Sequence, residues 1–205
     1  MAINRKFFFD YARINLFDGR FSPSQVKGLS LVLDEWDAHH ADLDDRFLAY
    51  MLGTAHHETG RTFQPVRETY AKTDQAAASI LENAWRRGRL PWVTNPYWYP
   101  DTEDKYWIGR GLVQITHKQN YSKLSELIGI DLVTDPTVAM IPAVAVRIMT
   151  RGMMAGAFTG HNLARYFNGP RGDWRGARRI INGLERADLV GSYAQRYYGA
   201  LSYTV

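Results

Sequence analysis

The sequence predicts a mainly α protein that folds as one domain covering residues 1–205. Apolar residues recur at helical spacing along most of the chain, and several helix-start signals precede them. Residues 112–115 are the single plausible short strand. No linker rich in Pro, Gly or Ser divides the chain, so we expect no additional module.

Two capping boxes mark helix starts, Ser22 with Gln25 and Thr116 with Gln119, and Pro23 takes a first helical position. Other helices are expected over residues 43–60, 73–88, 162–167, 173–182 and 185–201, with one more starting at Pro142. Periodicity predicts these inward-facing side chains for three of the helices: Val26, Leu29, Leu33 and Trp36; Ala77, Ile80, Leu81 and Ala84; Tyr121, Leu124, Leu127 and Ile128.

The composition is that of an ordinary globular protein, 45% hydrophobic and 22% charged. There is no cysteine, which excludes disulfides and thiolate chemistry. The net charge is +4, with acidic residues concentrated at 34–45 and seven arginines within 161–205. A basic face could approach an anionic polymer or a cell wall, although a solvated helix face explains it equally well. No aromatic and basic RNA-binding signature is present, so we expect no nucleic-acid partner.

The first ten residues contain one apolar run, Phe7-Phe8-Phe9. This run is too short for the core of a signal peptide or for a membrane span. We therefore expect a protein made in the cytoplasm without a signal peptide of its own and without stable membrane insertion.

Glu58 is the first candidate for chemistry. Counting back through Thr54 and Met51 to Phe47 gives the spacing of one helix face, so Glu58 is expected to continue the inward face. Gly60 and the following proline end the helix, which places this carboxyl group beside unsatisfied carbonyl oxygens. Burial and the negative helix end both disfavour the charged form, as a general acid requires. The alternative is an exposed Glu at a frayed helix end.

Glycoside hydrolysis usually needs a second carboxyl group across the scissile bond. Glu68 lies ten residues after Glu58, and the helix break allows the chain to turn back and bring it opposite. The separation of the two groups would decide between inversion and retention. The alternative for Glu68 is an ion pair with Arg67 or Arg61.

A metal centre is not expected. A zinc protease helix carries His-Glu-x-x-His, whereas residue 61 is Arg, and His56 and His57 point to different sides of a helix. Gly109-Arg110-Gly111 is not a phosphate-binding loop, because no Walker lysine follows. We expect no cofactor.

Polar residues after the second glycine suit sugar recognition. A strand over 112–115 would place Gln114 and Thr116 on one face, and Asn120 follows one helical turn later. Such side chains can bind sugar hydroxyl and acetamido groups or hold a water, although Thr116 could also serve only as a helix cap. In the loop at 89–108, six aromatic residues could stack on sugars, but we expect most of them to fill a core.

Three segments occur in a characteristic order: residues 55–60 (AHHETG), residues 109–116 (GRGLVQIT) followed by Asn120-Tyr121, and residues 180–183 (IING). Together they resemble the signatures of family 19 glycoside hydrolases, the chitinase-like enzymes with which some phage endolysins are grouped. The resemblance spans most of the chain and implies a mainly α, lysozyme-like, two-lobed helical domain with a small β element at the cleft. It also implies an inverting mechanism.

By this resemblance Glu58 matches the general acid, and His57 falls where members carry a histidine in the cleft. The positions that bind sugar or hold the nucleophilic water match Gln114, Thr116 and Asn120. Asn182 matches a substrate-contacting asparagine.

Two departures from the family pattern affect the site. Arg61 stands where the family usually has glycine, which changes the bend behind the acid. The second carboxylate does not align with that of plant chitinases, whereas endolysin-type members have a Glu at about the spacing of Glu68. We assign the base to Glu68 and keep Asp74 as the alternative.

The hypothesis is a bacteriolytic, endolysin-like glycosidase that cleaves β-1,4 bonds of the peptidoglycan glycan backbone. It would act as a monomer on glycan strands in the periplasm, after release from the host cytoplasm through a separate pore. Alternatives are a chitinase acting on GlcNAc polymers, a catalytically inactive glycan-binding protein, and a cationic protein that disrupts membranes.

Overall fold

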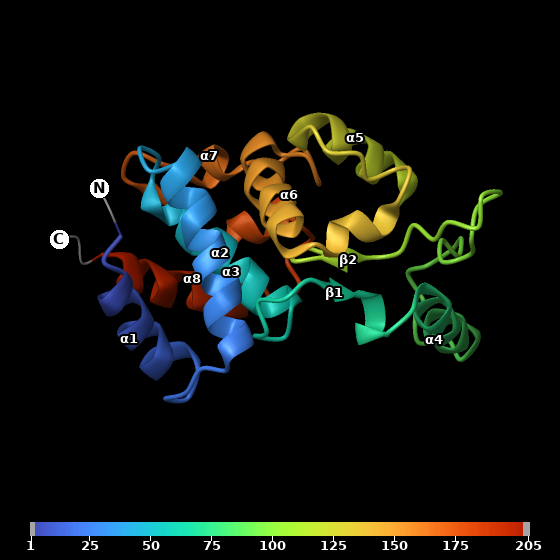
Figure 1. The fold of residues 1–205 in the computed structure, drawn as a ribbon, viewed down its shortest axis with the longest axis horizontal. Coiled ribbons are helices and arrows are strands. Elements are labelled where there is room, and N and C mark those ends of the chain that lie inside the picture. The colour runs from blue at the N-terminus through green and yellow to red at the C-terminus, as the bar shows by residue number, and fades with distance from the viewer. Residues whose placement is uncertain (1–2, 203–205) are drawn as a thin grey trace.

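The computed structural model describes residues 3–202; residues 1–2 and 203–205 of the predicted domain lie outside the described residues. The fold is mainly helical, with two small antiparallel strand pairs, which confirms the predicted fold class. Figure 1 shows most helices gathered at one end, α4 at the other, and the strands β1 and β2 between them. Within residues 3–202 no helix is long and apolar enough to cross a membrane.

The larger lobe contains these helices: α1 (Arg5–Leu16), α2 (Pro23–His39), α3 (Asp45–Glu58), α5 (Lys118–Ile128), α6 (Pro142–Ala155), α7 (Leu163–Tyr166) and α8 (Ala187–Leu201). Short 3₁₀ turns η2 (Pro136–Met140) and η3 (Gly176–Ile180) connect some of them. The smaller lobe consists of α4 (Asp74–Arg86) and the long loop that follows it. Between the lobes, β1 (Val66–Arg67) leads into the 3₁₀ turn η1 (Glu68–Tyr70).

Helix starts follow the sequence signals in most cases. Ser22 and Gln25 form the predicted capping box of α2, with Pro23 in the first turn, and Pro142 opens α6 as expected. Asp44 caps α3 and Thr73 caps α4 through side-chain oxygens. Helix α1 was not predicted. The segment predicted to be helical over 173–182 forms only the 3₁₀ turn η3.

The second predicted capping box is wrong. Helix α5 begins at Lys118, its N-cap residue is His117 with φ +70°, and the Thr116 hydroxyl instead donates to the Gln114 carbonyl. The backbone turn before the helix rotates Thr116 away from the free amides of the first turn, so it cannot act as a cap.

The strand predicted over residues 112–115 is also wrong. The strand is β2 (Arg110–Gly111), which pairs antiparallel with β1, and the chain then turns back so that Ile115 bridges Arg110. Gly111 has φ +92° and Gln114 has φ +54°, values that interrupt an extended strand. Hydrophobic residues 112 and 113 are buried because this turn lies inside the protein, not because they alternate across a sheet. A second pair joins β3 (Phe167–Asn168) to β4 (Arg171–Gly172).

Each lobe has its own hydrophobic core. The larger core is continuous from α1 to α8 and buries large side chains such as Phe8, Trp36 and Tyr197 completely or nearly so. The smaller core joins α4 to the loop through four buried residues, Ala77, Leu81, Trp98 and Ile108. Two of the predicted inward-facing residues are on the surface, since Val26 is 38% and Ile80 is 48% exposed.

The aromatic loop mostly fills core, as expected. Trp98 and Trp107 are buried, and Tyr97 and Tyr106 pack half-buried against the smaller core. Trp92 remains on the surface, 73% exposed.

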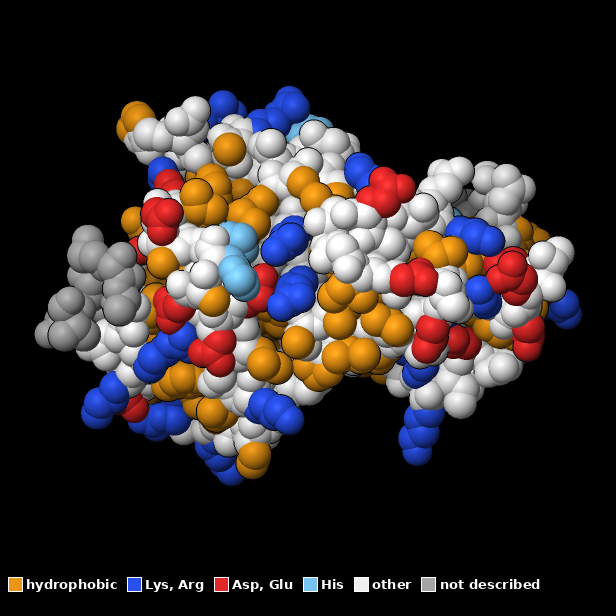
Figure 2. Space-filling model, turned by 45° about the horizontal axis from the view of Figure 1, so that its top comes forward, with side chains coloured by type: hydrophobic (Ala, Val, Ile, Leu, Met, Phe, Trp, Pro, Cys, Tyr) orange, Lys and Arg blue, Asp and Glu red, His pale blue; other side chains and the backbone are white. Residues whose placement is uncertain are grey.

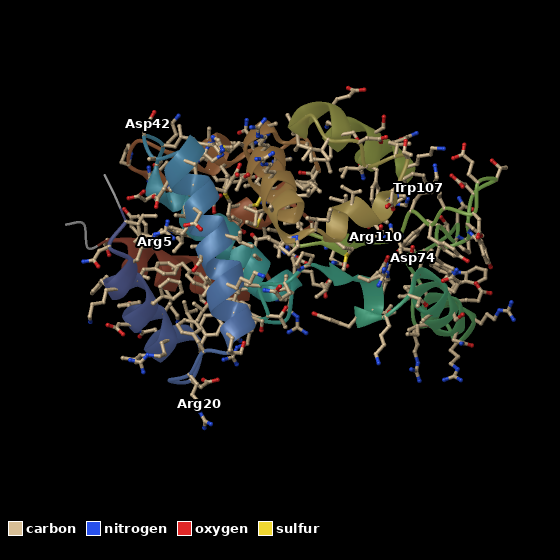
Figure 3. All side chains as sticks on the ribbon, viewed as in Figure 1. Arg5, Arg20, Asp42, Asp74, Trp107 and Arg110 are labelled. Atoms are coloured by element: carbon tan, nitrogen blue, oxygen red, sulfur yellow. The ribbon has the colours of Figure 1, made fainter. Side chains whose placement is uncertain are left out.

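Ionic contacts fasten the smaller lobe to the strands. Asp74, the first residue of α4, accepts from Arg67 Nε of β1 and from Arg110 Nη2 of β2, each at 2.5 Å. Arg110 is fully buried and also donates to the Tyr121 hydroxyl of α5 at 2.8 Å. Figure 3 shows Asp74 and Arg110 next to each other between α4 and the strands. This network joins both lobes to the strand pair.

Helices α3 and α8 pack so closely that one position must be glycine. A Cβ atom built on Gly53 would lie 2.7 Å from the backbone nitrogen of Ala194. No side chain fits there without moving one helix, so the two helix backbones approach as closely as only a glycine allows. This packing fixes the axis of α3, whose last residue is Glu58.

Candidate active site

Glu58 is the last residue of α3 and its carboxyl side chain is 16% exposed. The helix ends because the chain turns through positive φ at Gly60 (+56°) and Arg61 (+73°). Arg61, the departure from the family glycine, occupies the left-handed region and donates to Asp18 and to the Leu16 carbonyl. Glu58 is therefore half-buried and does not lie at a frayed exposed end.

The carboxylate of Glu58 contacts a buried cation. Arg178 is 4% exposed, and its Nη1 lies 2.7 Å from Glu58 Oε1. Its Nε donates to the Glu185 carbonyl, which fixes the guanidinium plane. Arg178 comes from η3, 120 residues away along the chain. The sequence pattern around Glu58 gave no indication of this partner.

The two histidines before Glu58 have different surroundings. His56 is buried against Tyr193 and Tyr197, its Nδ1 is 3.0 Å from the Tyr197 hydroxyl, and burial lowers its pKa to about 3. His57 is half-buried, and its pKa is lowered mainly by burial. The charges that act on His57 include Glu58 and Arg178, so this histidine lies near the ion pair.

Glu68 is held by neutral donors. The Tyr97 hydroxyl donates to its Oε1, and the backbone amide of Gly109 donates to its Oε2 at 2.7 Å. The Glu68 amide in turn donates to the Gly109 carbonyl at 2.7 Å, so backbone pairing fixes both residues. Neither Arg67 nor Arg61 pairs with Glu68, because these arginines bind Asp74 and Asp18.

Gln114 lies beside Glu68. A Cβ atom on Gly109 would be 2.8 Å from Gln114 Oε1 and 3.3 Å from Glu68 Oε2, so both side chains crowd the same glycine. Gln114 Nε2 donates to the Val66 carbonyl at 2.9 Å and to the Gly111 carbonyl at 3.3 Å. The amide nitrogen is thus used internally, and Oε1 is the atom available to a ligand.

Thr116 and Asn120 continue from Gln114 as a chain of hydrogen bonds. Thr116 Oγ1 donates to the Gln114 carbonyl at 3.1 Å, and Asn120 Nδ2 donates to the Thr116 carbonyl at 2.7 Å. Both side chains are half-buried. The structure therefore places Glu68, Gln114, Thr116 and Asn120 in one group around β2 and the start of α5.

Asn182 belongs to the group around Glu58. Its backbone amide donates to the carbonyl of Arg178 at 3.0 Å, while its side chain is exposed and accepts from the Gly183 amide. The exposed amide group is open to a ligand next to the segment that carries Arg178.

Tyr70 connects the two groups. It belongs to η1, the turn that starts at Glu68, and its hydroxyl lies 3.5 Å from the Glu58 carbonyl. Burial and the charge of Glu58 raise the pKa of Tyr70.

Figure 2 shows histidine, acidic and basic side chains together in the middle of one face, beside a broad area of hydrophobic side chains. In the same view the outline of the molecule narrows between the two lobes.

Asp74, the alternative base, has both carboxylate oxygens occupied by Arg67 and Arg110. Asp74 therefore attaches α4 to the strands. Separately, no group of three or more His, Cys, Asp or Glu side chains that could hold a metal ion occurs within residues 3–202.

Sequence reasoning did not identify Arg178 or Tyr97 as parts of the site. Arg178 has an identical neighbour, Arg179, and burial alone separates the two. Tyr97 is one of six aromatic residues in the loop, and only its contact with Glu68 distinguishes it. Proximity to the third motif was the one available signal for Arg178.

No protein-family model and no curated protein sequence matches the chain. Among solved structures, it is similar to chitinase C from Streptomyces griseus HUT6037, with 18% identity and a TM-score of 0.56 over 99% of this chain and 78% of that one. A mutant of chitinase C gives a TM-score of 0.57 at the same identity and coverage. A bacterial family 19 chitinase is 20% identical, with a TM-score of 0.49, over 96% of this chain and 95% of that one. The chain therefore has the fold of chitinase C, in agreement with the chitinase-like fold that the three motifs predicted.

Proposed function

We propose that the protein is a glycoside hydrolase that cleaves β-1,4 bonds in the glycan backbone of peptidoglycan. The observation that carries this proposal is the placement of Glu58 and Glu68 at the two ends of the short segment between α3 and η1, each fixed by its own partners, within a chitinase-like fold. Two carboxyl groups on opposite sides of a sugar bond are what glycoside hydrolysis requires.

In this proposal Glu58 is the general acid. It donates its proton to the leaving oxygen and becomes a carboxylate, which the Arg178 guanidinium then stabilises at 2.7 Å. A fixed cation aimed at charge that develops during the reaction lowers the barrier more than it stabilises bound substrate. The contact between Arg178 and Glu58 supports this role, because it puts the guanidinium where the new carboxylate charge would form.

Glu68 is the general base of an inverting mechanism. Its two fixed donors, Tyr97 and Gly109, hold the carboxylate in one orientation, and Gln114 Oε1 lies beside it. Glu68 would remove a proton from a water, and Gln114 and Thr116 would orient that water. Asp74 is disfavoured as the base because its oxygens bind two arginines.

Peptidoglycan is proposed as substrate because a net charge of +4 suits an anionic wall. As an endolysin, the protein would be made in the host cytoplasm and reach the periplasm after release. The second candidate substrate is chitin, which the fold likeness to chitinase C favours. Both polymers contain β-1,4-linked N-acetylated amino sugars.

The test uses purified protein with peptidoglycan and, separately, with chitin oligomers. Mass analysis of the new reducing end identifies the bond, and NMR of fresh products identifies the anomer; an α product supports inversion. Glu58→Gln and Glu68→Gln should each lower activity by roughly 10²–10⁴-fold while the helical circular dichroism signal is kept. Wild-type protein that binds glycan without cleaving it would indicate an inactive binding protein. Cell lysis retained by Glu58→Gln would instead indicate membrane disruption.

A further inference from the structure

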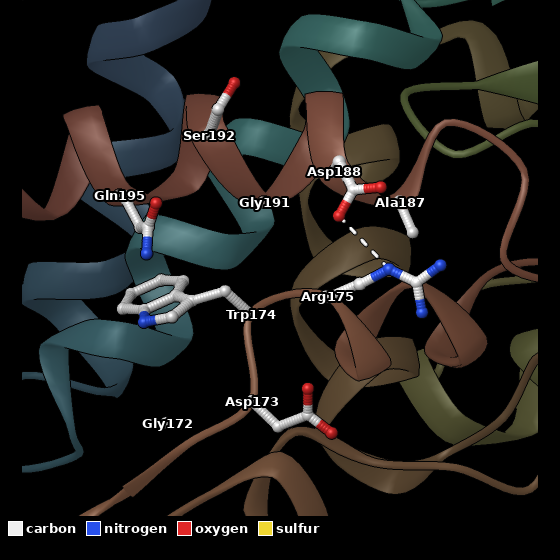
Figure 4. A pocket seen from close by; sticks show the side chains of 9 residues that line it. All are labelled: Gly172, Asp173, Trp174, Arg175, Ala187, Asp188, Gly191, Ser192 and Gln195. Carbon is white, nitrogen blue, oxygen red and sulfur yellow. Dashed lines mark hydrogen bonds and ion pairs between the residues drawn. The ribbon is translucent and has the colours of Figure 1, made fainter.

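A polar depression lies on the larger lobe, between α8 and the segment that follows β4. It has a volume of about 300 Å³, within the range of small-ligand sites. Figure 4 shows its lining: Gly172, Asp173, Trp174, Arg175, Ala187, Asp188, Gly191, Ser192 and Gln195. None of these residues belongs to the candidate active site.

The indole of Trp174 forms the wall of this pocket. Its ring packs against Phe167 (centroids 4.8 Å apart) and Tyr198 (5.7 Å), so the ring is supported from the protein side. A Cβ atom on Gly191 would lie 3.2 Å from the Trp174 carbonyl oxygen, so the absence of a side chain there lets the segment approach α8. Within residues 3–202 no acceptor binds the indole N–H, so this donor is available to a ligand.

One amide side chain lies next to the indole, and a hydroxyl group lies further along α8. Gln195 extends from α8 toward the Trp174 ring in Figure 4, and its exposed amide offers both a donor and an acceptor. The Ser192 hydroxyl donates to the Leu189 carbonyl and keeps its lone pairs as acceptors. An aromatic ring next to an amide group matches a sugar ring, which has an apolar C–H face and polar edges.

The charges that line the pocket do not favour a strongly anionic ligand. The lining carries two aspartates, Asp173 and Asp188, and one arginine, Arg175. Arg175 is also paired with Asp188 at 3.1 Å. The lining therefore offers no cluster of cations for a phosphate-rich polymer, whereas a neutral N-acetylated sugar needs none.

We propose that this pocket is a second glycan-binding site, which takes one or two N-acetylated amino-sugar units of a strand against the Trp174 indole. The inference rests on the proposed function for the identity of the polymer. It assigns to the larger lobe a means of holding an insoluble glycan independently of the catalytic residues.

The first experiment follows the indole N–H signals of the six tryptophans by NMR in the Glu58→Gln protein, during titration with a soluble chitin tetramer. The Trp174 signal, assigned by its loss in Trp174→Phe, should shift, whereas the signal of exposed Trp92 should not. An unmoved Trp174 signal at saturating tetramer overturns the proposal.

The second experiment measures adsorption to insoluble peptidoglycan and chitin. Gln195→Ala, an exposed substitution that leaves the core intact, and Trp174→Ala should weaken adsorption roughly fivefold or more, because aromatic anchors dominate binding sites. Trp92→Ala is the matched control and should bind as wild type. Cleavage of the short soluble tetramer should be unchanged by Gln195→Ala.

Failure of the two proposals gives different results. Unchanged adsorption by both pocket variants, together with an inactive Glu58→Gln protein, rejects the second site alone. An active Glu58→Gln protein rejects the proposed function, whatever happens at Trp174.

Discussion

The two candidate carboxylates are held in opposite ways. Glu58 depends on one charged side chain, Arg178, that arrives from 120 residues later in the chain. Glu68 is held by a tyrosine hydroxyl and a backbone amide, both from the segment after α4. One carboxylate therefore has a counter-ion in contact, while the other is oriented without one.

This difference matches the two tasks that the proposal assigns. In the proposal, Arg178 stabilises the carboxylate that Glu58 becomes, whereas Glu68 is only oriented by its two neutral donors. The difference also predicts unequal sensitivity: removal of the cation should affect the molecule more than removal of one neutral donor.

The largest effect is expected for Arg178→Ala. It leaves the half-buried Glu58 carboxylate without its partner, which should cost about 3 kcal/mol of unfolding free energy. Activity should fall by roughly 10²–10³-fold, as for loss of a charge-stabilising donor. Urea unfolding and steady-state kinetics measure the two effects. Arg179→Ala, the exposed neighbour, is the control.

A double variant sharpens this result. Adding Glu58→Gln to Arg178→Ala removes the unpaired charge, so part of the lost stability should return. Simple additivity of the two substitutions would show that the ion pair contributes nothing to the fold.

The next effect is expected for Arg110→Met, which breaks the contact between α4 and the strands. Loss of this buried cation should cost about 3 kcal/mol, and exchange of the α4 amides should accelerate relative to those of α3. Hydrogen exchange with mass spectrometry measures the difference between the lobes. Equal protection of α4 in both proteins would contradict the assigned role of Arg110.

A smaller, pH-dependent effect is expected from His56. Burial lowers its pKa to about 3 from the usual 6.5, so the unfolded chain binds a proton in this interval and the folded protein does not. The stability from His56 is complete above pH 6.5 and is lost as pH falls toward 3, by at most about 1.4 kcal/mol per pH unit. Urea unfolding at pH 7, 6 and 5 should show this slope, and His56→Phe should flatten it.

The smallest effect is expected for Tyr97→Phe. It removes one of two donors to Glu68 and should cost about 1–2 kcal/mol, with roughly tenfold lower activity. Tyr99→Phe is a matched control, because the Tyr99 hydroxyl also donates to a glutamate, Glu82, away from the site. If both variants lose the same activity, Tyr97 has no special relation to Glu68.

The fold class and most helices could be predicted because their signals are local. Caps and apolar periodicity lie within a few residues of the elements they define, as Ser22 and Pro142 show. The strand and the cap around Thr116 were wrong because the backbone turns at Gly111 and Gln114 are accompanied by contacts with β1, including the bond from Gln114 to the Val66 carbonyl. Those contacts come from distant parts of the sequence.

Only those residues of the candidate site that lie inside a sequence motif could be selected from the sequence. Residues inside motifs, such as Glu58 and Gln114, could be selected from their neighbours in sequence. Arg178 and Tyr97 act only through contacts made by folding across 120 and 29 residues, so no local pattern marks them. The roles of all these residues remain predictions for the variants above to test.

The tight packing of α3 against α8 makes Gly53 an unexpected point of vulnerability. This residue has no functional group, yet any methyl group there would wedge the helices apart and carry the end of α3 away from η3. A survey of all single substitutions should therefore find position 53 as intolerant as the acid five residues beyond it. Intolerance of substitution at position 53 would then reflect the spacing between α3 and α8 and not a chemical role of the residue.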